Sequence, residues 1–443
     1  MTGRFAHERV VVVGLGVAGR AAARVLAEEG ARVRVSEARP DPGGVDEIAS
    51  LGVEVRVGGH HPEHLDGASA VVASPGVSEH APVLGWARER GVPIWSELDV
   101  GARLCEVPYV AITGTNGKST TTKLVATMMQ AAGLDAVACG NIGHPFSIAA
   151  REGHEALAVE ASSFQLRFHH WLHPRVSVLL NVAPDHIDWH GSIAGYAASK
   201  ARIFALQGDG DVHVGNAEDP AAAQISRRAS CEQIWFRLGE PGEGEVGYAD
   251  GELRSRFHEA VDLGRPALDT AGFRADAAAA AAAGLAFGLD GEAVGTGLSR
   301  MEPLPHRGEA VAHVGGVVFL DDSKATNVHA ALNALAGKGD VVLIAGGLSK
   351  GAELGPLVTA APSLAGLVAI GEAASELVSL FEGLVAVRKA GSIEEAVRTA
   401  FELCPRPGTV LLAPACASWD MFRDYTERGE RFARAALALG EEV

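Results

Sequence analysis

Residues 110–121 read Val-Ala-Ile-Thr-Gly-Thr-Asn-Gly-Lys-Ser-Thr-Thr, an apolar stretch that runs into a glycine-rich turn and then into a helix start. This strand–loop–helix pattern is typical of a phosphate-binding loop, whereas the simpler alternative is an ordinary glycine turn before a helix. Glycines let the backbone approach a phosphate closely, and the N–H groups at a helix start attract the anion. Lysine supplies charge to the outer phosphates, and a following hydroxyl can bind Mg²⁺. The segment therefore predicts ATP binding by Gly114, Thr115, Asn116, Gly117, Lys118, Ser119 and Thr120.

The length and composition predict a globular protein of several domains. At 443 residues the chain has room for about three domains of ~150 residues each. The formal net charge of −17 argues against broad binding to nucleic acid or to an anionic membrane. A local cationic pocket for phosphates remains compatible with this charge.

The cysteines and the apolar segments indicate a cytoplasmic protein. The five cysteines are odd in number and show no paired spacing, which fits a reducing compartment and gives no metal motif. No apolar run approaches the ~20 residues of a membrane-spanning helix. The apolar start at residues 10–17 is interrupted by Gly14 and Gly16 and followed by Arg20, so it does not resemble a signal peptide.

The N-terminal block has the pattern of a Rossmann-like βαβ unit. Residues 9–20 read Arg-Val-Val-Val-Val-Gly-Leu-Gly-Val-Ala-Gly-Arg, a strand followed by G-x-G-x-x-G. A helix at 21–29 and a strand at 31–35 follow, and Glu37 stands where a dinucleotide fold places its ribose-binding acid. The glycines either bind a nucleotide pyrophosphate or only permit tight strand–helix packing, because the motif alone is a weak signal. An NAD-linked dehydrogenase remains an alternative for this block alone.

The rest of the chain predicts two more α/β units. Strands are expected in the second block at 156–160 and 176–181, small antiparallel strands within 239–264, and a helix over the alanine-rich stretch 275–286. In the third block, apolar runs predict strands at 317–320, 341–345, 366–370 and 409–412. The expected fold is α/β with three domains: a Rossmann-like N-terminal domain, a central P-loop ATPase-like parallel sheet and a C-terminal Rossmann-like domain.

Polar residues stand at the predicted strand ends of the second block, where open α/β sheets bind ligands. Glu160 ends one strand, Asn181 ends another, and Asp185 and His186 follow. Mg²⁺ prefers oxygen ligands and keeps waters and phosphates in its shell, so Glu160 suits an ATP-bound ion. His186 is a candidate for a second ion, although a lone loop histidine is more often structural.

Several segments together resemble the Mur ligases of peptidoglycan synthesis. They are GTNGKST, GNIG at 140–143, EASSFQL from Glu160, NVAPDHIDWH from Asn181 and YAASKARIF from Tyr196. The resemblance continues with LPHR at 304–307, DDSKATN at 321–327, GGLSK at 346–350 and APACASWDMF at 413–422, so it covers nearly the whole chain. The phosphate loop alone is shared with other amide ligases such as folylpolyglutamate synthetase.

The resemblance implies an ADP-forming ligase that adds D-glutamate to UDP-N-acetylmuramoyl-L-alanine through an acyl phosphate, during cell wall synthesis. Residues 1–97 would bind the UDP-sugar, 98–301 ATP, and 302–443 the amino acid. The enzyme would use ATP and two Mg²⁺ ions, act as a monomer in the cytoplasm, and bind neither nucleic acid nor membrane. The resemblance implies UDP-sugar contacts from Gly14, Leu15, Gly16, Gly19, Glu37, Arg39, Gly76, Asn141, Ser162 and Ser163.

The same resemblance implies the remaining site residues. The catalytic set would be Lys118, Glu160, His186, Lys200 and Lys324, with Ser119, Glu160 and His186 as metal ligands. Lys200 resembles the family's carbamylated lysine, whose CO₂-derived carbamate turns a cation into an oxygen ligand for the second Mg²⁺; the alternative is a lysine on an exposed helix face. Further ATP contacts would come from Arg307 and Asp322, and amino-acid contacts from Thr326, Lys350, Ser418 and Tyr425.

One segment departs from the family pattern. The family usually carries His-Asn-x-x-Asn before the alanine-rich helix, whereas here the first pair is missing, with Phe273 in this stretch, and Asp276 replaces the second Asn. This difference puts the nucleotide contacts in question. A ligase for L-glutamate or another amino acid, and a catalytically silent nucleotide-binding paralogue, remain alternatives.

Overall fold

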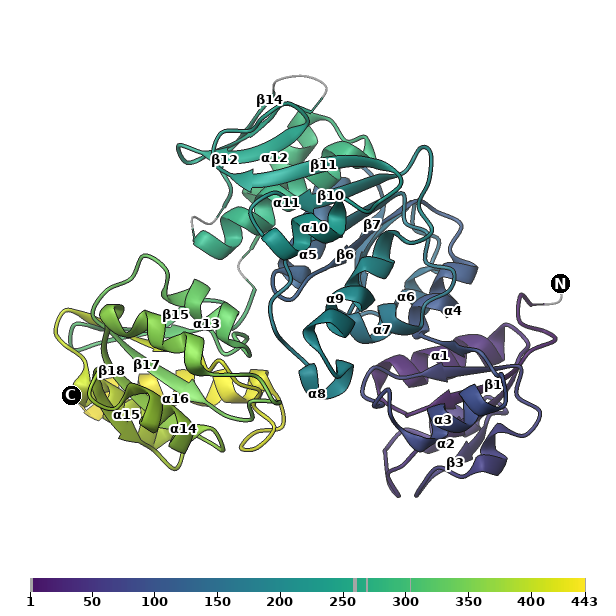
Figure 1. Cartoon of the computed structure of the whole chain (residues 1–443), viewed down its shortest axis with the longest axis horizontal. Helices are drawn as coiled ribbons and strands as arrows, with labels where there is room; N and C mark the ends of the chain where they lie inside the picture. Colours follow the sequence, from purple (N-terminus) through teal and green to yellow (C-terminus); the bar gives the residue numbers. More distant parts are fainter. Residues whose placement is uncertain (1–2, 258–260, 268–269, 303, 443) are drawn as a thin grey trace. The chain divides into compact units, whose positions relative to one another are not determined.

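The computed structural model describes residues 3–257, 261–267, 270–302 and 304–442. The strands form three mainly parallel sheets of five, nine and six strands, with helices in most of the connections between them (Figure 1). This arrangement confirms the predicted α/β fold. The chain divides into two compact units. The first unit comprises Met1–Val182, Trp189–Asp269 and Phe273–Met301, and the second comprises Ala183–Asp188, Thr270–Gly272 and Glu302–Val443.

The N-terminal sheet is parallel, with the strand order β3-β2-β1-β4-β5. Alternate side chains of β1 enter two different cores: Val10 and Val12 pack with α1 and α4, and Val11 and Val13 with α3. The predicted βαβ start is confirmed. The elements are β1 (Arg9–Val13), α1 (Val17–Glu28), β2 (Arg32–Ser36), α2 (Val45–Ala49), β3 (Glu54–Arg56), η1 (Pro62–Leu65), β4 (Ala70–Ala73), α3 (Pro82–Glu89), β5 (Ile94–Trp95) and α4 (Glu97–Leu104).

The nine-stranded sheet has the order β14-β13-β12-β11-β10-β9-β6-β8-β7. Its strands from β7 to β12 run parallel, and β12, β13 and β14 are antiparallel, as predicted for 239–264. The phosphate-loop strand β6 lies between β9 and β8. The strands are β6 (Tyr109–Thr113), β7 (Ala136–Gly140), β8 (Ala156–Glu160), β9 (Val176–Leu179), β10 (Val212–Asn216), β11 (Glu232–Leu238), β12 (Glu245–Ala249), β13 (Glu252–Ser255) and β14 (Val261–Gly264).

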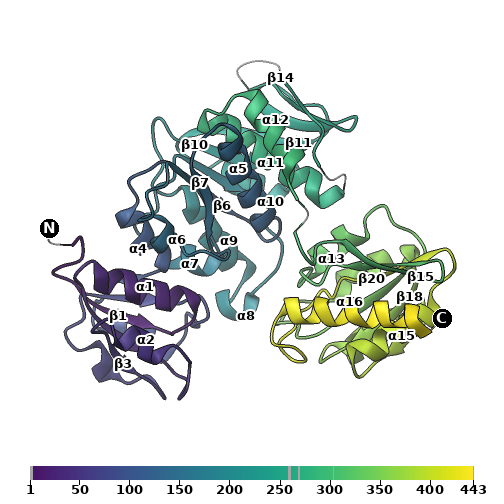
Figure 2. The ribbon, with the colours of Figure 1, turned by 180° about the vertical axis from the view of Figure 1, so that it is seen from behind.

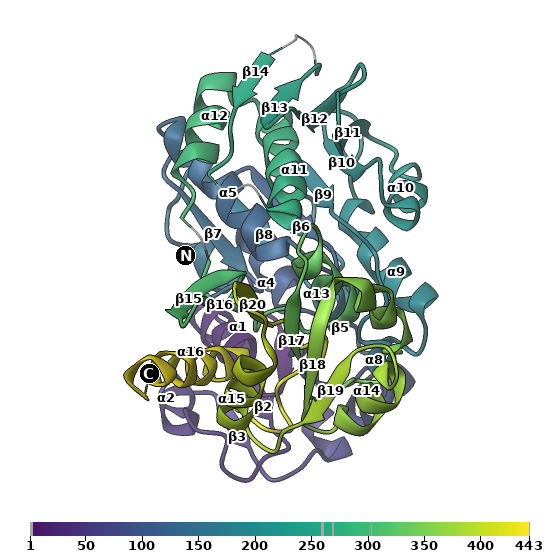
Figure 3. The ribbon, with the colours of Figure 1, turned by 90° about the vertical axis from the view of Figure 1, so that its left-hand side faces the viewer.

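Helices pack on this sheet, and α12 lies along α5 (Figure 3). The alanine-rich helix is confirmed as α11, in which Ala277 and Ala283 are fully buried because small side chains allow close packing. The helices are α5 (Lys118–Ala131), α6 (Phe146–Ala149), α7 (Ser163–Phe168), α8 (Ile187–His190), α9 (Ile193–Ala201), η2 (Arg202–Phe204), α10 (Pro220–Ser226), α11 (Ala271–Phe287) and α12 (Gly291–Arg300).

The six-stranded sheet of the second unit has the order β15-β16-β20-β17-β18-β19, and only β15 and β16 pair antiparallel. Helices α15 and α16 cover one face, with α16 plainly visible in Figure 2, and α13, η3 and α14 cover the other. The elements are β15 (Glu309–Val314), β16 (Val317–Asp321), α13 (Val328–Leu335), β17 (Val341–Gly346), η3 (Gly355–Ser363), β18 (Leu364–Ile370), α14 (Ala374–Phe381), β19 (Ala386–Lys389), α15 (Ile393–Leu403), β20 (Gly408–Leu412) and α16 (Tyr425–Glu442). Over the described part of the chain, no helix combines the length and apolarity that crossing a bilayer requires.

Candidate active site

The phosphate loop connects β6 to α5 in the first unit. Gly117 is the N-cap of α5 with φ of 85°, a backbone conformation that favours glycine. The Lys118 ammonium group donates hydrogen bonds to the carbonyl oxygens of Gly114 and Thr115, at 3.0 and 2.9 Å. The loop backbone therefore surrounds the lysine ammonium group, and the loop leads into the positive N-terminal end of a 14-residue helix.

Asn181, which follows β9, holds the loop in this shape. Its side-chain oxygen accepts from the Asn116 backbone N–H at 2.8 Å, and its amide nitrogen donates to the Asn116 carbonyl at 3.2 Å. The Thr115 N–H also donates to the Asn181 carbonyl, at 3.0 Å. A strand-end asparagine thus fixes the loop backbone, a role that the sequence analysis did not assign.

Lys200 of α9 is buried beside the same loop. Its side chain is only 1% exposed, and its ammonium nitrogen donates to the Gly114 carbonyl at 2.6 Å. The ammonium group also lies 4.4 Å from the centre of the Tyr196 ring, whose hydroxyl donates to Thr115 Oγ1 at 3.1 Å. The interpretation of Lys200 as a lysine on an exposed helix face is therefore wrong.

Glu160 ends β8, the neighbour of β6, and is buried. The Asn141 amide donates to one of its carboxylate oxygens at 2.9 Å. The other oxygen, Oε2, is buried and has no hydrogen-bond partner among the described residues. A buried carboxylate oxygen without a partner is costly, so this atom is suited to a cation.

These residues fit a magnesium ion bound with ATP. No group of three or more His, Cys, Asp or Glu side chains arranged for a metal occurs in the described ranges. Mg²⁺ needs no such group, because substrate phosphates and waters complete its shell. Glu160 and the hydroxyl of Ser119, in the first turn of α5, would hold it.

A cavity of about 710 Å³ lies where the N-terminal sheet meets the start of the nine-stranded sheet. It is formed by the β1–α1 turn, the carboxyl ends of β2 and β4, and the segment after β7. Of the predicted UDP-sugar residues, those that line it are Gly14, Leu15, Gly16, Glu37, Arg39, Gly76 and Asn141. Gly19, Ser162 and Ser163 are not among its lining residues.

Those three residues have structural contacts. A Cβ at Gly19 would collide with the Gly14 carbonyl, which supports the tight-packing role for this glycine. Ser162 caps α7 by exchanging hydrogen bonds with Gln165. The Ser163 hydroxyl is 2.9 Å from Nε2 of His190.

Glu37 holds the glycine turn together. Its carboxylate accepts from the Leu15 N–H at 2.6 Å and from the Arg39 N–H and Nε at 2.9 and 3.1 Å. Burial alone would raise the pKa of Glu37, but these hydrogen bonds and the Arg39 charge outweigh it and lower the pKa to about 2. The carboxylate is therefore ionised, and it accepts hydrogen bonds from the backbone of the glycine turn and from Arg39.

The cavity lining also includes residues that were not predicted from the sequence, and two of them carry larger polar side chains, Gln165 and His60. Gln165 stands within the E-x-SSFQL segment but was not assigned to the site, and His60 follows β3. The signal for His60 was available, since Gly58-Gly59-His60 comes directly after a parallel strand, as Glu37 does after β2.

The second unit contains the remaining predicted residues. His186 has φ of 53°, an uncommon conformation for a residue with a side chain, and its N–H donates to Asp185 at 2.9 Å. The Lys350 ammonium donates to Asp185 at 3.0 Å, and both side chains are 8% exposed. Asn327 donates to the other oxygen of Asp185 at 3.3 Å. Lys350, predicted to bind an amino-acid carboxylate, thus binds a carboxylate of the protein in this structure.

The other predicted residues surround β16 and the start of α16. The Lys324 ammonium lies 3.8 Å from the centre of the Tyr425 ring. Burial raises the pKa of Asp322 to about 7, against the opposing charge of Arg307. Ser418 is buried and its carbonyl accepts from the Phe422 N–H at 2.8 Å, while the Thr326 N–H donates to the Lys324 carbonyl at 2.8 Å.

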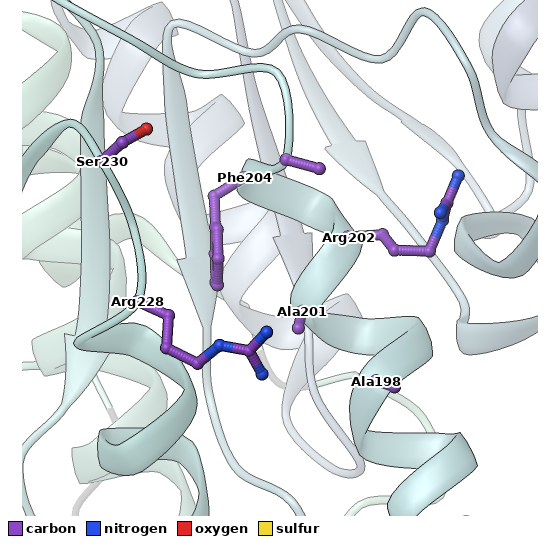
Figure 4. Close-up of a pocket in the computed structure, with 7 residues that line it drawn as sticks. Ala198, Ala201, Arg202, Phe204, Arg228 and Ser230 are labelled. Atoms are coloured by element: carbon purple, nitrogen blue, oxygen red, sulfur yellow. The ribbon is translucent and has the colours of Figure 1, made fainter.

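A smaller cavity of about 260 Å³ lies along α9 and η2 (Figure 4). Arg228 extends toward Ala201 and Phe204, whereas Arg202 points away and donates to the Leu166 carbonyl at 2.8 Å. None of the predicted site residues lines this cavity. Its lining consists of Ala198, Ala201, Arg202, Phe204, Ala205, Arg228 and Ser230.

The chain is similar to known proteins over nearly its whole length. Residues 112–249 match the Mur ligase middle domain, and residues 8–96 match the Mur ligase MurD-like N-terminal domain. The UDP-N-acetylmuramoylalanine--D-glutamate ligase of Frankia casuarinae is 41% identical over 97% of this chain and 94% of its own. The protein of the same name from Streptomyces avermitilis is 39% identical over 98% of both chains.

Solved structures share the fold at lower identity. A pseudomurein peptide ligase type C from Methanothermus fervidus has a TM-score of 0.62 at 19% identity, covering 98% of this chain and 99% of its own. UDP-N-acetylmuramate-alanine ligase from Thermotoga maritima has a TM-score of 0.61 at 18% identity, covering 98% of this chain and 100% of its own. The fold and the site define a nucleotide-binding α/β protein of three sheets. This chain belongs to the Mur ligase family.

Proposed function

We propose that this chain is an ATP-dependent ligase that adds D-glutamate to UDP-N-acetylmuramoyl-L-alanine in peptidoglycan precursor synthesis. The observation that carries the proposal is the near-full-length similarity, at 39–41% identity, to relatives that bear the name of that reaction. The site agrees with it, because one unit combines a phosphate loop with a separate cavity at a second glycine turn.

The chemistry requires activation of a carboxylate. The carboxylate of the sugar-linked L-alanine is a poor electrophile, so it attacks the γ-phosphorus of ATP, and ADP leaves. The amine of D-glutamate then attacks the acyl phosphate, an amide forms, and inorganic phosphate leaves. Because the phosphoryl group passes between two anions, the protein must supply positive charge.

The residues of the first unit divide this work. Lys118 stabilises the transferring phosphoryl group, and the N–H groups of the loop bind the phosphates of ATP. Members of the Mur ligase family use ATP and Mg²⁺; the ion offsets phosphate charge, and Glu160 with Ser119 would hold it here. Asn141 lines the cavity and donates to Glu160, so it connects the UDP-sugar side with the ATP side.

The residues of the second unit are proposed to complete the reaction. Arg307 and Asp322 would contact ATP, with Asp322 facing its ribose, and Lys324 would stabilise the developing charge. Thr326, Lys350, Ser418 and Tyr425 would bind the carboxylates of D-glutamate. The contact between Lys350 and Asp185 supports this role, because the ammonium group donates to a carboxylate there, as it would to a carboxylate of the substrate.

Lys200 is proposed to carry a carbamate. Its neutral amine would attack CO₂, a C–N bond would form, and one proton would be released, which leaves an anionic oxygen ligand for a second Mg²⁺. The support is the burial of Lys200 beside the phosphate loop, together with Lys118 on the same carbonyl. Two ammonium groups at one carbonyl repel each other, and a carbamate removes that repulsion.

We also propose the assignment of residues 1–97, 98–301 and 302–443 to UDP-sugar, ATP and amino-acid binding. The two family matches at 8–96 and 112–249 support the first two parts. The protein is further proposed to work as a monomer in the cytoplasm, where its nucleotide substrates are found.

A phosphate-release assay tests the function. The purified protein receives UDP-N-acetylmuramoyl-L-alanine, ATP and Mg²⁺ with D-glutamate, L-glutamate or other amino acids in parallel, with Lys118→Ala as the inactive control. Phosphate release that depends on both the sugar nucleotide and D-glutamate supports the proposal. Preference for L-glutamate or another amino acid identifies a related ligase, and no release with any of them indicates the catalytically silent paralogue.

A further inference from the structure

The carboxyl edge of the N-terminal sheet carries a histidine to which no role has been assigned. The chain leaves β3, and the Gly58 N–H donates to the Arg39 carbonyl at 3.1 Å and the Gly59 N–H to the Glu37 carbonyl at 3.2 Å. Both glycines have positive φ, 85° and 146°, so the chain can turn tightly there. This turn places His60 in the lining of the 710 Å³ cavity.

A buried hydroxyl holds the ring of His60. Ser36, the last residue of β2, is fully buried, and its Oγ lies 2.8 Å from Nδ1 of His60 and 2.8 Å from Nδ1 of His64. No further hydrogen-bond partner of this hydroxyl occurs among the described residues. Both rings are therefore held through Nδ1, so Nε2 is the ring nitrogen of His60 that remains for a ligand in the cavity that His60 lines.

The hydroxyl has one proton and, among the described residues, only the two rings as acceptors, so its own proton is hydrogen-bonded only when one ring accepts it. Ser36 donates to one Nδ1 and accepts from the Nδ1–H of the other ring. Burial lowers the pKa of both His60 and His64, which favours neutral rings with one proton each. When His60 is the acceptor, its own proton is on Nε2, and when His60 is the donor, Nε2 carries no proton and can only accept.

The strand order indicates which part of the ligand meets His60. In the order β3-β2-β1-β4, the glycine turn after β1 carries the positive end of α1, where a diphosphate binds. His60 follows β3, two strands or roughly 10 Å to one side. Asn141, which donates to Glu160, also lines the cavity, and under the proposed function the reacting carboxylate lies on this side, close to the ATP-binding residues. The nucleoside therefore extends toward His60.

We propose that His60 donates a hydrogen bond from Nε2 to an acceptor oxygen of the nucleoside end of the UDP-sugar, with Ser36 and His64 selecting the tautomer. The inference rests on the proposed function. A bound acceptor oxygen favours the arrangement in which Ser36 donates to His60 and accepts from His64. His60 is thus a specificity-determining residue for the nucleotide, and Ser36 is a positioning residue.

Binding of UDP alone tests this directly. His60→Ala should weaken UDP binding about tenfold in isothermal titration calorimetry, the loss of one hydrogen bond from a preorganised donor. His61→Ala is the matched control, because His61 is exposed, adjacent and outside the cavity lining. His60→Gln keeps a donor of similar reach and should recover part of the affinity, while the KM for ATP stays unchanged in all three variants.

A spectroscopic measurement separates hydrogen bonding from a purely structural role. In protein labelled with ¹⁵N-histidine, the signals absent from His60→Gln identify this ring, and they should show the Nε2–H tautomer when UDP is bound. An Nδ1–H tautomer in the complex, or equal UDP affinity of His60→Ala and His61→Ala, would overturn the inference. Absence of UDP binding by the unaltered protein would instead refute the proposed function on which it rests.

Discussion

Lys118 and Lys200 meet at one backbone atom, the carbonyl oxygen of Gly114. Lys118 donates to it at 3.0 Å and Lys200 at 2.6 Å, although the two lysines come from different helices. Two ammonium groups on one acceptor repel each other. The phosphates of ATP would offset this repulsion, and a carbamate on Lys200 would replace one of the two cations with an anion.

Replacement of Lys200 should abolish most turnover whether the charge is kept or removed. Arginine remains a cation and cannot capture CO₂, and alanine leaves the metal without an oxygen ligand. We expect Lys200→Arg and Lys200→Ala to lose roughly 10²-fold in kcat, the usual loss for a group that stabilises the transition state electrostatically. The measurement is phosphate release, with ATP binding followed separately by calorimetry.

Small carboxylates provide the control for the carbamate. Formate or acetate should partly restore Lys200→Ala, because they can occupy the vacated space, and should not restore Lys200→Arg. A Lys200→Arg enzyme with normal activity would show that no carbamate is needed at this position.

Lys118→Ala should abolish turnover as well, for a different reason. The lysine supplies charge to the phosphoryl group during transfer, and losses of about 10²-fold or more are expected for such groups. UDP binding should persist, because the UDP cavity does not include Lys118. Near-normal phosphate release by a folded variant would contradict the assignment of ATP binding and phosphoryl transfer to this loop.

Gly117 and Asp276 form a testable pair. A Cβ at Gly117 would collide with the Asp276 carboxylate, and the positive φ of Gly117 disfavours any side chain. Gly117→Ala should therefore lose ATP affinity, and adding Asp276→Ala should recover only the steric part. Calorimetric titration with ATP measures both; full recovery in the double variant would show that the backbone conformation contributes little.

Asp276→Asn alone should strengthen ATP binding several-fold. The carboxylate lies against the loop that would receive phosphates, so removing its charge reduces repulsion between like charges. Asn at this position also restores the residue that the family usually carries. A higher KM for ATP in Asp276→Asn would instead mean that this protein uses the carboxylate as a nucleotide contact.

Glu37 should make stability depend on acid pH. Its pKa falls from 4.5 to about 2 on folding, so its contribution is complete above about pH 4.5 and declines as the pH falls toward 2. Glu37→Gln should therefore lower the melting temperature at pH 7, and the difference from the unaltered protein should narrow between pH 4.5 and pH 2.5. Thermal unfolding followed by circular dichroism measures this; a difference that stays constant with pH would contradict the ionic role.

The sequence predicted the parts of the fold that local pattern determines. Apolar runs of five residues, such as 156–160, are visible as strands because both faces of a parallel strand are buried. Strands β10 and β11 were missed because His213 and Arg237 interrupt their apolar pattern. His213 is nevertheless fully buried, and its Nδ1 is 2.7 Å from the Ser177 hydroxyl. Such compensation depends on a distant strand and is invisible locally.

The site residues in contiguous motifs were likewise predictable, and the contacts between distant segments were not. The phosphate loop is contiguous, so its residues could be named from the sequence, and the family resemblance added residues from other segments. The burial of Lys200 could not be inferred from composition, because it depends on how α9 packs against the loop. His60 was not predicted because its ring is held by the buried hydroxyl of Ser36, which stands 24 residues upstream in the chain.

The contact between Asp185 and Lys350 limits how the second unit can be produced as a separate fragment. The six residues that carry Asp185 belong to the second unit although they lie more than a hundred positions upstream of its main segment. A fragment beginning at residue 302 would lack them, and Lys350 would have a buried ammonium group without its carboxylate. A stable excised fragment would need a substitute for that loop, such as a grafted peptide carrying the aspartate or an uncharged side chain at position 350.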